Sequence, residues 1–356
     1  MSNAHKTILV AGVQGIIGRH ATEHYAAQPG ATVVGLSRRP GDLPGVRHLS
    51  VDLLKPDEVR EKLAEVKDRV THAVFAAYIA SPTAAERNTA NVAILKNFLD
   101  IMEDAPALEH FTFYQGGKAY GSDLGPYKTP AREDDPRLMP PNFYYAQEEL
   151  VRERQRGRSW HFTGFIPDAV CGFATGNPMN IFMVITIYAT ISRELGLPLR
   201  FPGSDAAWRA LTQVTSADLL ARATAWAGAA PAARNDVFNL TNGDAFRWQH
   251  LWPRIARMFR MEVADPVPMS LAEYMADKQP VWDSIVAKYQ LQPVPWHQIA
   301  AWPFGDAVFG MTYDNVFNTL KIRRAGFHEA TDTDEMFDGF LKKLRAGRVI
   351  PAFPEE

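Results

Sequence analysis

The stretch that decides the fold is Val10-Ala11-Gly12-Val13-Gln14-Gly15-Ile16-Ile17-Gly18, near the start of a chain of 356 residues. It has the spacing G-x-x-G-x-x-G, after an apolar run at 6–11 typical of a buried strand and before a helical pattern at 15–27. Glycines permit a tight turn and a close approach of backbone N–H groups to a pyrophosphate, whose charge a helix N-terminus favours. The stretch predicts a dinucleotide site contacted by Gly12, Gly15, Ile16, Ile17 and Gly18, and the alternative is an ordinary glycine-rich turn.

Outward from this stretch, β-branched runs alternate with helical patterns. We expect strands at 6–11, 32–37, 48–51, 72–77, 110–115, 162–167 and 237–240, and helices at 15–27, 56–66, 88–102 and 145–155. Such strands pair in parallel, because a parallel connection needs a crossover element, and right-handed crossovers build a doubly wound sheet. We therefore expect an α/β fold, with a Rossmann-type parallel sheet at 1–172 and a returning strand near 237–242. A smaller, mainly helical substrate-binding lobe at 173–356 is expected to be interleaved with it.

The composition of the chain argues against several classes of partner and of cellular location. Lys plus Arg is 38 and Asp plus Glu is 40, so the net charge of −2 argues against nucleic acid or an anionic membrane as the main partner. The single cysteine, Cys171, excludes an intramolecular disulfide. The longest apolar stretch, 181–191, is shorter than the ~20 residues that span a bilayer, and no secretory signal is recognised. We expect a soluble cytoplasmic protein that binds a small molecule, and we leave a homodimer open.

The end of the second expected strand indicates which dinucleotide is bound. Sites for NAD place a carboxylate there, whereas this chain has Ser37, Arg38 and Arg39, which suit the 2′-phosphate of NADP. The alternative is that both arginines are solvated loop charges. Asp52, after the third strand, is expected either to bond the adenine amine or to cap the next helix.

One spacing resembles a metal site. His20-Ala21-Thr22-Glu23-His24 reads H-x-x-E-H, a pattern of some zinc peptidases. No third ligand is recognisable downstream, and the helix is committed to packing on the sheet. We predict no metal and two solvated histidines.

The glycine spacing and the alternation resemble the extended short-chain dehydrogenase/reductase superfamily, whose members carry Tyr-x-x-x-Lys. Here the fourth position after Tyr145 is Glu149, and a lysine stands instead at Lys118, in Gln115-Gly116-Gly117-Lys118-Ala119-Tyr120-Gly121. This displacement, together with Asn142-Phe143-Tyr144-Tyr145-Ala146-Gln147-Glu148-Glu149, resembles the progesterone 5β-reductase/iridoid synthase-like enone reductases. The resemblance covers almost the whole chain.

This resemblance implies NADPH-dependent 1,4-reduction of the activated C=C bond of an enone or enal. Hydride reaches the β-carbon, and negative charge develops on the carbonyl oxygen as an enolate, which needs a hydrogen-bond donor. We expect Tyr145 to be that donor, with Lys118 beside it to stabilise the negative oxygen. The alternative is that the tyrosine is a packing aromatic and the lysine a solvated loop charge.

The resemblance also suggests further contacts. We expect the cofactor to touch Tyr145 and the residues after several strands, namely Leu53, Ala76, Pro167, Ala169 and Val170. The pocket for a small hydrophobic enone or enal is expected to be lined by Tyr78, Tyr127, Asn180, Met183 and Phe304. The segment around Met183 could equally be a core or dimer-interface helix. Ala119 stands where the family has histidine, and Tyr78 where plant members have tryptophan, so the substrate is left open.

Two other functions are compatible with the sequence. One is a carbonyl reductase or a nucleotide-sugar epimerase/dehydratase of the same superfamily, against which Glu149 argues. The other is a non-catalytic binding protein that senses NADP, against which the retained Tyr145 and Lys118 argue.

Overall fold

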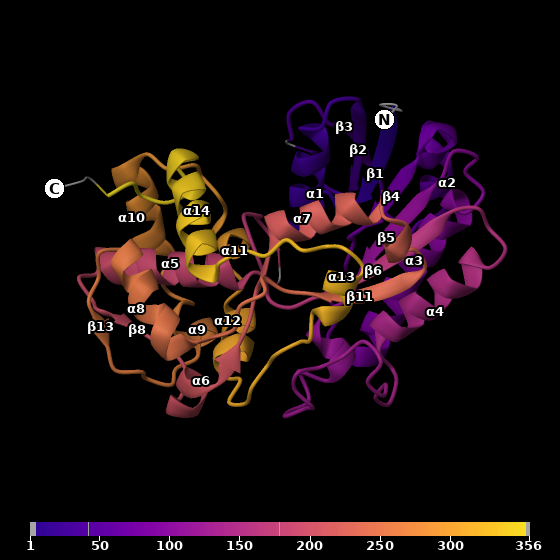
Figure 1. Ribbon diagram of the computed structural model, residues 1–356. Helices are drawn as coiled ribbons and strands as arrows, with labels where there is room; N and C mark the ends of the chain where they lie inside the picture. Colours follow the sequence, from indigo (N-terminus) through magenta and orange to yellow (C-terminus); the bar gives the residue numbers. More distant parts are fainter. Residues whose placement is uncertain (1–4, 42, 178, 354–356) are drawn as a thin grey trace.

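The computed structural model describes residues 5–41, 43–177 and 179–353, which form two lobes side by side (Figure 1). The first lobe is built on a seven-stranded sheet in the order β11-β6-β5-β4-β1-β2-β3, and every neighbouring pair is parallel. Its strands are β1 (Lys6–Ala11), β2 (Ala31–Ser37), β3 (Arg47–Ser50), β4 (His72–Phe75), β5 (His110–Tyr114), β6 (His161–Pro167) and β11 (Asp236–Leu240). The expected Rossmann-type sheet is confirmed, and β11 is its seventh strand.

Successive side chains of a strand point to opposite faces of the sheet, so the core of this lobe has two layers. In β1, Leu9 faces the layer under α2 (Pro56–Ala64), α3 (Ala84–Met102) and α4 (Phe143–Gln155). Ile8 and Val10 face the opposite layer, under α1 (Ile16–Ala26), α7 (Ala217–Ala227) and α13 (Leu320–Arg324). All three side chains are fully buried, as expected for a parallel sheet covered on both faces. Short 3₁₀ turns η1 (Lys67–Arg69), η2 (Gly117–Tyr120) and η3 (Pro231–Ala233) lie between these elements.

The second lobe is helical and packs around α5 (Ile181–Glu194), whose residues from Ile181 to Ser192 are all buried. This is the apolar stretch that the sequence singled out, and it is a core helix. Around it lie α6 (Asp205–Arg209), α8 (Trp248–Met258), α9 (Leu271–Tyr274), α10 (Gln279–Tyr289), α11 (Trp296–Ile299), α12 (Trp302–Phe309) and α14 (Thr333–Ala346). Among the described residues, no helix combines the length and apolarity of a membrane span.

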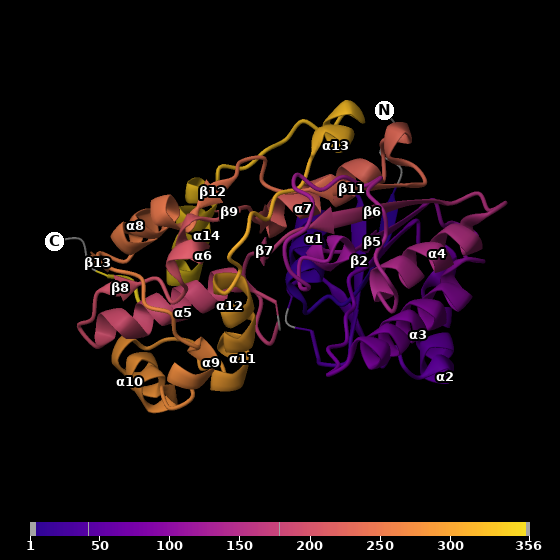
Figure 2. The same ribbon diagram turned by 90° about the horizontal axis from the view of Figure 1, so that it is seen from below.

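Three two-stranded ribbons complete the fold. They are β7 (Val170–Cys171) with β10 (Thr215–Ser216), β8 (Leu199–Arg200) with β13 (Val263–Ala264), and β9 (Leu211–Thr212) with β12 (Phe246–Arg247). After α5 the chain returns to the first lobe for α7 and β11, and again for α13 (Figure 2). The lobes are therefore interleaved in sequence.

His20 joins the parts of the fold that meet behind the glycine loop. Its Nδ1 lies 2.6 Å from Oδ1 of Asp218 on α7, and its Nε2 accepts a hydrogen bond from the backbone N–H of Phe173 at 3.2 Å. The side chain is buried, so the expectation of a solvated histidine is wrong here. His20, the first residue of the H-x-x-E-H spacing, instead links α1 to α7 and to the segment after β7.

Histidines begin three neighbouring strands, where His72, His110 and His161 lie in register. His110 is almost fully buried, and its Nε2 has no hydrogen-bond partner within the described residues. Burial, with repulsion from neighbouring cationic groups, lowers the pKa of His110 to about 3. In the unfolded chain, His110 therefore binds a proton near pH 6.5, whereas in the folded chain it stays neutral until the pH is much lower.

We expect the free energy of unfolding to fall as the pH drops from about 6.5 towards 3, with roughly 1.4 kcal/mol per pH unit arising from His110. Urea unfolding of His110→Phe should show a shallower pH dependence than the wild type. The same change at the exposed His328 is the control. Parallel pH profiles for the wild type and His110→Phe would contradict the assignment.

Candidate active site

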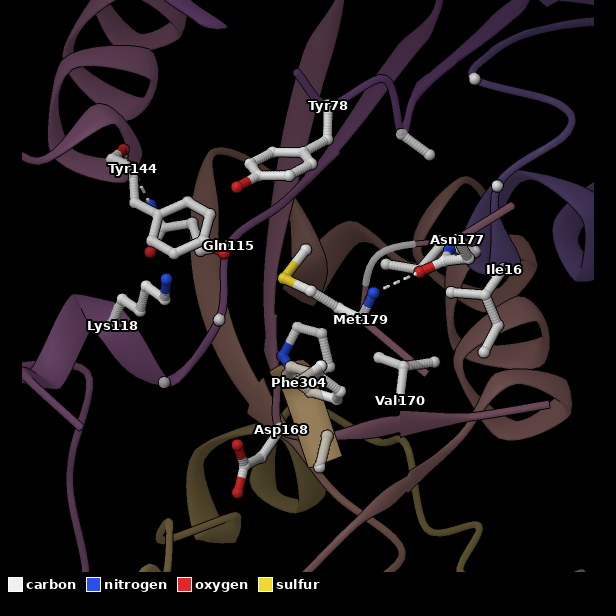
Figure 3. Close-up of a pocket in the computed structure, with 18 of the residues that line it drawn as sticks. Ile16, Tyr78, Gln115, Lys118, Tyr144, Asp168, Val170, Asn177, Met179 and Phe304 are labelled. Carbon is white, nitrogen blue, oxygen red and sulfur yellow. Dashed lines mark hydrogen bonds between the residues drawn. The ribbon is translucent and has the colours of Figure 1, made fainter. Parts of the chain in front are cut away.

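A cavity of about 960 Å³ opens where the carboxyl ends of the sheet strands face the second lobe (Figure 3). Ligands bind at this edge in open α/β sheets. The cavity brings together most of the residues selected from the sequence: Gly12, Gly15, Ile16, Ile17, Ser37, Arg38, Arg39, Asp52, Leu53, Ala76, Tyr78, Lys118, Pro167, Ala169, Val170 and Phe304. Five others do not line it: Gly18, Tyr127, Tyr145, Asn180 and Met183.

The glycine loop has the form that a pyrophosphate cradle requires. Gly12 has φ +84°, and a Cβ there would lie 2.6 Å from the carbonyl oxygen of Ala76, so only glycine fits between the two loops. Gly15 caps α1, and the first helical residues, Ile16 and Ile17, line the cavity beside the open helix N-terminus. Gly18 serves another purpose, because a Cβ there would lie 2.2 Å from the carbonyl oxygen of Gly12. It lets α1 pack against the loop.

The end of β2 carries positive charge suited to a phosphate. The Arg38 guanidinium has no hydrogen-bond or ion-pair partner within the described residues. Arg39 reaches the second lobe, donating to the carbonyl oxygen of Thr175 and to Oε1 of Gln298, each at 3.4 Å. The Ser37 hydroxyl lies 2.8 Å from Nε2 of His48, a neighbour that the sequence did not indicate. The residues present fit a 2′-phosphorylated dinucleotide.

Asp52 has both a structural contact and a place in the cavity. Its Oδ1 accepts a hydrogen bond from the N–H of Leu54 at 3.1 Å, which orders the turn before α2. The residue that caps α2 is Lys55, so Asp52 is not the helix cap. Its position in the lining remains compatible with the predicted contact to adenine.

Tyr144, and not Tyr145, faces the cavity. α4 begins at Phe143, capped by the Asn142 side chain, and successive residues on a helix point about 100° apart. The Tyr144 hydroxyl lies at the cavity wall, where a Cβ on Gly116 would be only 2.9 Å from it. The Tyr145 hydroxyl is turned away, donating to the carbonyl oxygen of Ala119 at 2.6 Å and accepting from the N–H of Leu138 at 3.2 Å. The expected place of Tyr145 in the site is therefore corrected to Tyr144.

Lys118 lies next to Tyr144 at one end of the cavity (Figure 3). It is carried by η2, and its Nζ lies 3.7 Å from a carboxylate oxygen of the half-exposed Asp123. Asn142 donates to the carbonyl oxygen of Lys118 at 2.8 Å while capping α4, so one side chain fixes both elements. A lysine from a β–α junction thus stands beside a tyrosine from a helix start.

The Tyr144 hydroxyl has no hydrogen-bond partner within the described part of the chain. Burial raises the pKa of Tyr144 above its ordinary value, assisted by the nearby Tyr78 and Asp123. The phenol is therefore neutral at pH 7 and can donate a hydrogen bond into the cavity.

Three residues expected in the substrate pocket have structural roles. Asn180 caps α5, accepting from the N–H of Met183 and donating to the carbonyl oxygen of Gly172. Met183 is buried in the core of the second lobe. Tyr127 donates its hydroxyl to Oδ1 of Asn315 and stacks on Tyr120. The side chains of all three residues are engaged in the fold, and none of them lines the cavity.

Sequence reasoning missed several groups that line the cavity. Met179 projects into its middle (Figure 3), and Trp248, Val308 and Met311 add apolar surface from the second lobe. Asp168 lines it as a buried carboxyl, and burial raises the pKa of Asp168 to about 7. The one available signal was its position directly after a predicted strand, where ligand-binding residues gather.

The fold and the cavity define an oxidoreductase of the Rossmann class. The family model described as the PRISE-like Rossmann-fold domain matches residues 48–351, and the chain belongs to this family.

Sequence relatives and solved structures are consistent with this family and this fold. The chain is 33% identical to the (S)-8-oxocitronellyl enol synthase of Catharanthus roseus, covering 96% of this chain and 92% of that protein. It is 30% identical to a short chain dehydrogenase of Penicillium aethiopicum, covering 97% and 99%. The UDP-glucose 4-epimerase of Thermotoga maritima superposes with a TM-score of 0.69 at 15% identity, over 96% of this chain and 99% of that one, which shows the shared fold.

We expect Arg38→Ala to weaken binding of NADPH by ~10-fold or more while leaving NADH unchanged, because a charge-assisted contact to the 2′-phosphate contributes about 1.5–3 kcal/mol. Fluorescence titration of both dinucleotides measures this. Arg60→Ala, which removes an equal charge from the exposed face of α2, is the control. Equal losses of affinity for NADPH and NADH in Arg38→Ala would show that Arg38 does not recognise the 2′-phosphate.

Proposed function

We propose that the protein is an NADPH-dependent reductase that adds hydrogen across the activated C=C bond of an enone or enal. The observation that carries the proposal is the Tyr144 hydroxyl beside Lys118, which bonds to no described residue and lies at the wall of a cavity that the glycine loop also lines. Its curated relatives are named enol synthases and a short chain dehydrogenase, which supports a reaction through an enolate.

The chain's first contribution is binding and orientation. The glycine loop and the α1 N-terminus would hold the pyrophosphate, and Arg38 the 2′-phosphate. The backbone at Pro167, Ala169 and Val170 is proposed to fix the nicotinamide end. Ala169 has φ 33°, an uncommon conformation for a residue with a side chain, which turns the chain sharply at this point. Bound NADPH supplies the hydride that the β-carbon accepts.

The chain's second contribution is to stabilise the charge that develops on the carbonyl oxygen. Tyr144 donates a hydrogen bond to this oxygen, and its raised pKa keeps the proton on the phenol until the enolate forms. The Lys118 ammonium stabilises the resulting negative charge through space. Apolar walls from Phe304, Val308 and Met311 exclude water, which strengthens both interactions.

We expect Tyr144→Phe to lower kcat by at least ~100-fold, because losing one oxyanion donor costs about 3–4 kcal/mol in the barrier. NADPH affinity should be unchanged. Steady-state kinetics with an enone and fluorescence titration of NADPH measure the two effects.

Tyr145→Phe is the matched control, since it removes one hydroxyl from the adjacent residue. It should keep kcat within ~10-fold and reduce stability by about 1 kcal/mol through loss of the bond to Ala119. A larger loss of kcat in Tyr145→Phe than in Tyr144→Phe would remove Tyr144 from the mechanism.

The bond that is reduced separates this proposal from a carbonyl reductase. With NADPH and 2-cyclohexen-1-one, we expect cyclohexanone, identified by gas chromatography. The allylic alcohol would instead support carbonyl reduction. NADPH binding without consumption across a panel of enones, enals and ketones would favour a binding protein.

A further inference from the structure

A buried polar cluster lines the cavity away from Tyr144. We call it the Asp168 cluster, and it comprises Asp168 at the end of β6, Gln213 between β9 and β10, Asn315 after α12, and Tyr127. Asn315 donates from Nδ2 to Oδ2 of Asp168 at 2.6 Å and accepts the Tyr127 hydroxyl on its own Oδ1. Asp168, Gln213 and Asn315 are less than one-tenth exposed, yet all three belong to the cavity lining. The cluster is thus a buried polar spot in the cavity lining, held in place by hydrogen bonds among its own members.

Nothing within the described fold explains why a carboxyl is buried at this place. Asp168 forms no ion pair with any described residue, although it is buried in the cavity lining. A buried carboxyl is costly unless it is well bonded. Asn315 donates to it, and the Ala169 backbone and the Gln213 side chain also favour its charged form, whereas an ionised carboxylate can accept about four hydrogen bonds. Asp168 therefore retains capacity to accept from a ligand.

Gln213 lies beside Asp168 in the cluster, and its side chain favours the charged form of that carboxyl. Its Oε1 accepts from the N–H of Phe317 at 3.1 Å, which fixes the direction of the amide. Its Nε2 is buried near the Asp168 carboxyl but makes no hydrogen bond of good geometry to it or to any other described residue, so it can still donate to a ligand. Buried polar atoms without a partner are uncommon and call for an explanation such as a ligand.

The position of the cluster sets the length of such a ligand. A Cβ on Gly116 would lie 2.9 Å from the Tyr144 hydroxyl, and one on Gly117 would lie 3.3 Å from Oδ1 of Asp168. Gly116 is fully extended, so these two directions point to opposite sides of the chain. Figure 3 likewise shows Asp168 apart from Tyr144 and Lys118. A ligand that contacts both ends must be elongated.

We propose that the Asp168 cluster binds a hydroxyl group at the end of the substrate remote from its reacting C=C–C=O unit. A hydroxyl donates to Asp168 and accepts from the Gln213 amide through one atom. An ammonium has no lone pair for Gln213, and a carboxylate is repelled by Asp168. This inference rests on the proposed function and narrows the substrate class to elongated, terminally hydroxylated enones or enals.

The experiment compares two ligands that differ by one hydroxyl. The substrates are (E)-non-3-en-2-one and (E)-9-hydroxynon-3-en-2-one, and the saturated counterparts are nonan-2-one and 9-hydroxynonan-2-one. Turnover of the plain enone tests the proposed function. The ratio of kcat/KM between the two enones, and the ratio of Kd between the saturated ketones on the NADP⁺-loaded protein by calorimetry, test the cluster.

We expect the wild type to prefer the hydroxylated member by ~10-fold in both ratios, in line with one net hydrogen bond. Asp168→Leu should bring both ratios to about one while the plain enone is still reduced. Asp168→Asn, which keeps the shape and is the safer variant for folding, should give an intermediate preference. Asp314→Asn is the control, because this neighbouring carboxylate bonds the N–H of Leu211 outside the cavity lining.

Equal Kd values for the two saturated ketones in the wild type, or a preference that persists in Asp168→Leu, would overturn the inference. If neither enone is reduced but the hydroxylated ketone binds more tightly through Asp168, the proposed function fails and the subsite stands. If the plain enone is reduced and the hydroxylated ligands are not preferred, the proposed function stands and the subsite fails.

Discussion

Two hydrogen bonds between the start of α4 and the η2 turn hold the reactive end of the cavity together. Asn142 donates to the carbonyl oxygen of Lys118, and Tyr145 donates to that of Ala119. Because both acceptors are backbone atoms, the bonds fix the path of the turn and therefore the base from which Lys118 extends. Tyr144 lies between the two donors in sequence, so the same contacts fix its position. This junction sets the relative position of the lysine and the phenol, and the bond from Asn142 remains when the Tyr145 hydroxyl is removed.

In the proposed mechanism, this arrangement places a lysine beside the tyrosine although the lysine lies outside the helix that carries it. In the superfamily pattern, both groups share one helix face and their spacing is set by the helix itself. Here Glu149 occupies the helical position and pairs with Arg137, on the outer side of α4. The lysine comes from the turn after β5, and tertiary hydrogen bonds replace helical periodicity as the constraint. A group supplied in this way leaves the helix surface free for other contacts.

The sequence predicted the sheet well and the reactive side chains less well, for physical reasons. Strands buried on both faces give long apolar runs, and β1 was found at the residues expected. Tyr145 was selected because Glu149 stands four residues after it, at the place of the superfamily's lysine, but the adjacent Tyr144 is the tyrosine that lines the cavity. A shift of one residue turns a side chain by about 100°. The role of Asp168 was not visible, because its partner Asn315 lies 147 residues further along the chain.

The repeated passage of the chain between the lobes has a consequence for dissecting or recombining them. A fragment ending at residue 172 would keep six strands but lose α7 and β11, which cover Val10 and pair with β6. Its sheet would present a bare edge and an uncovered apolar face, both of which favour aggregation. Exchange of the substrate-binding half with a homologue therefore requires several matched junctions, and a single fusion point would not preserve either half.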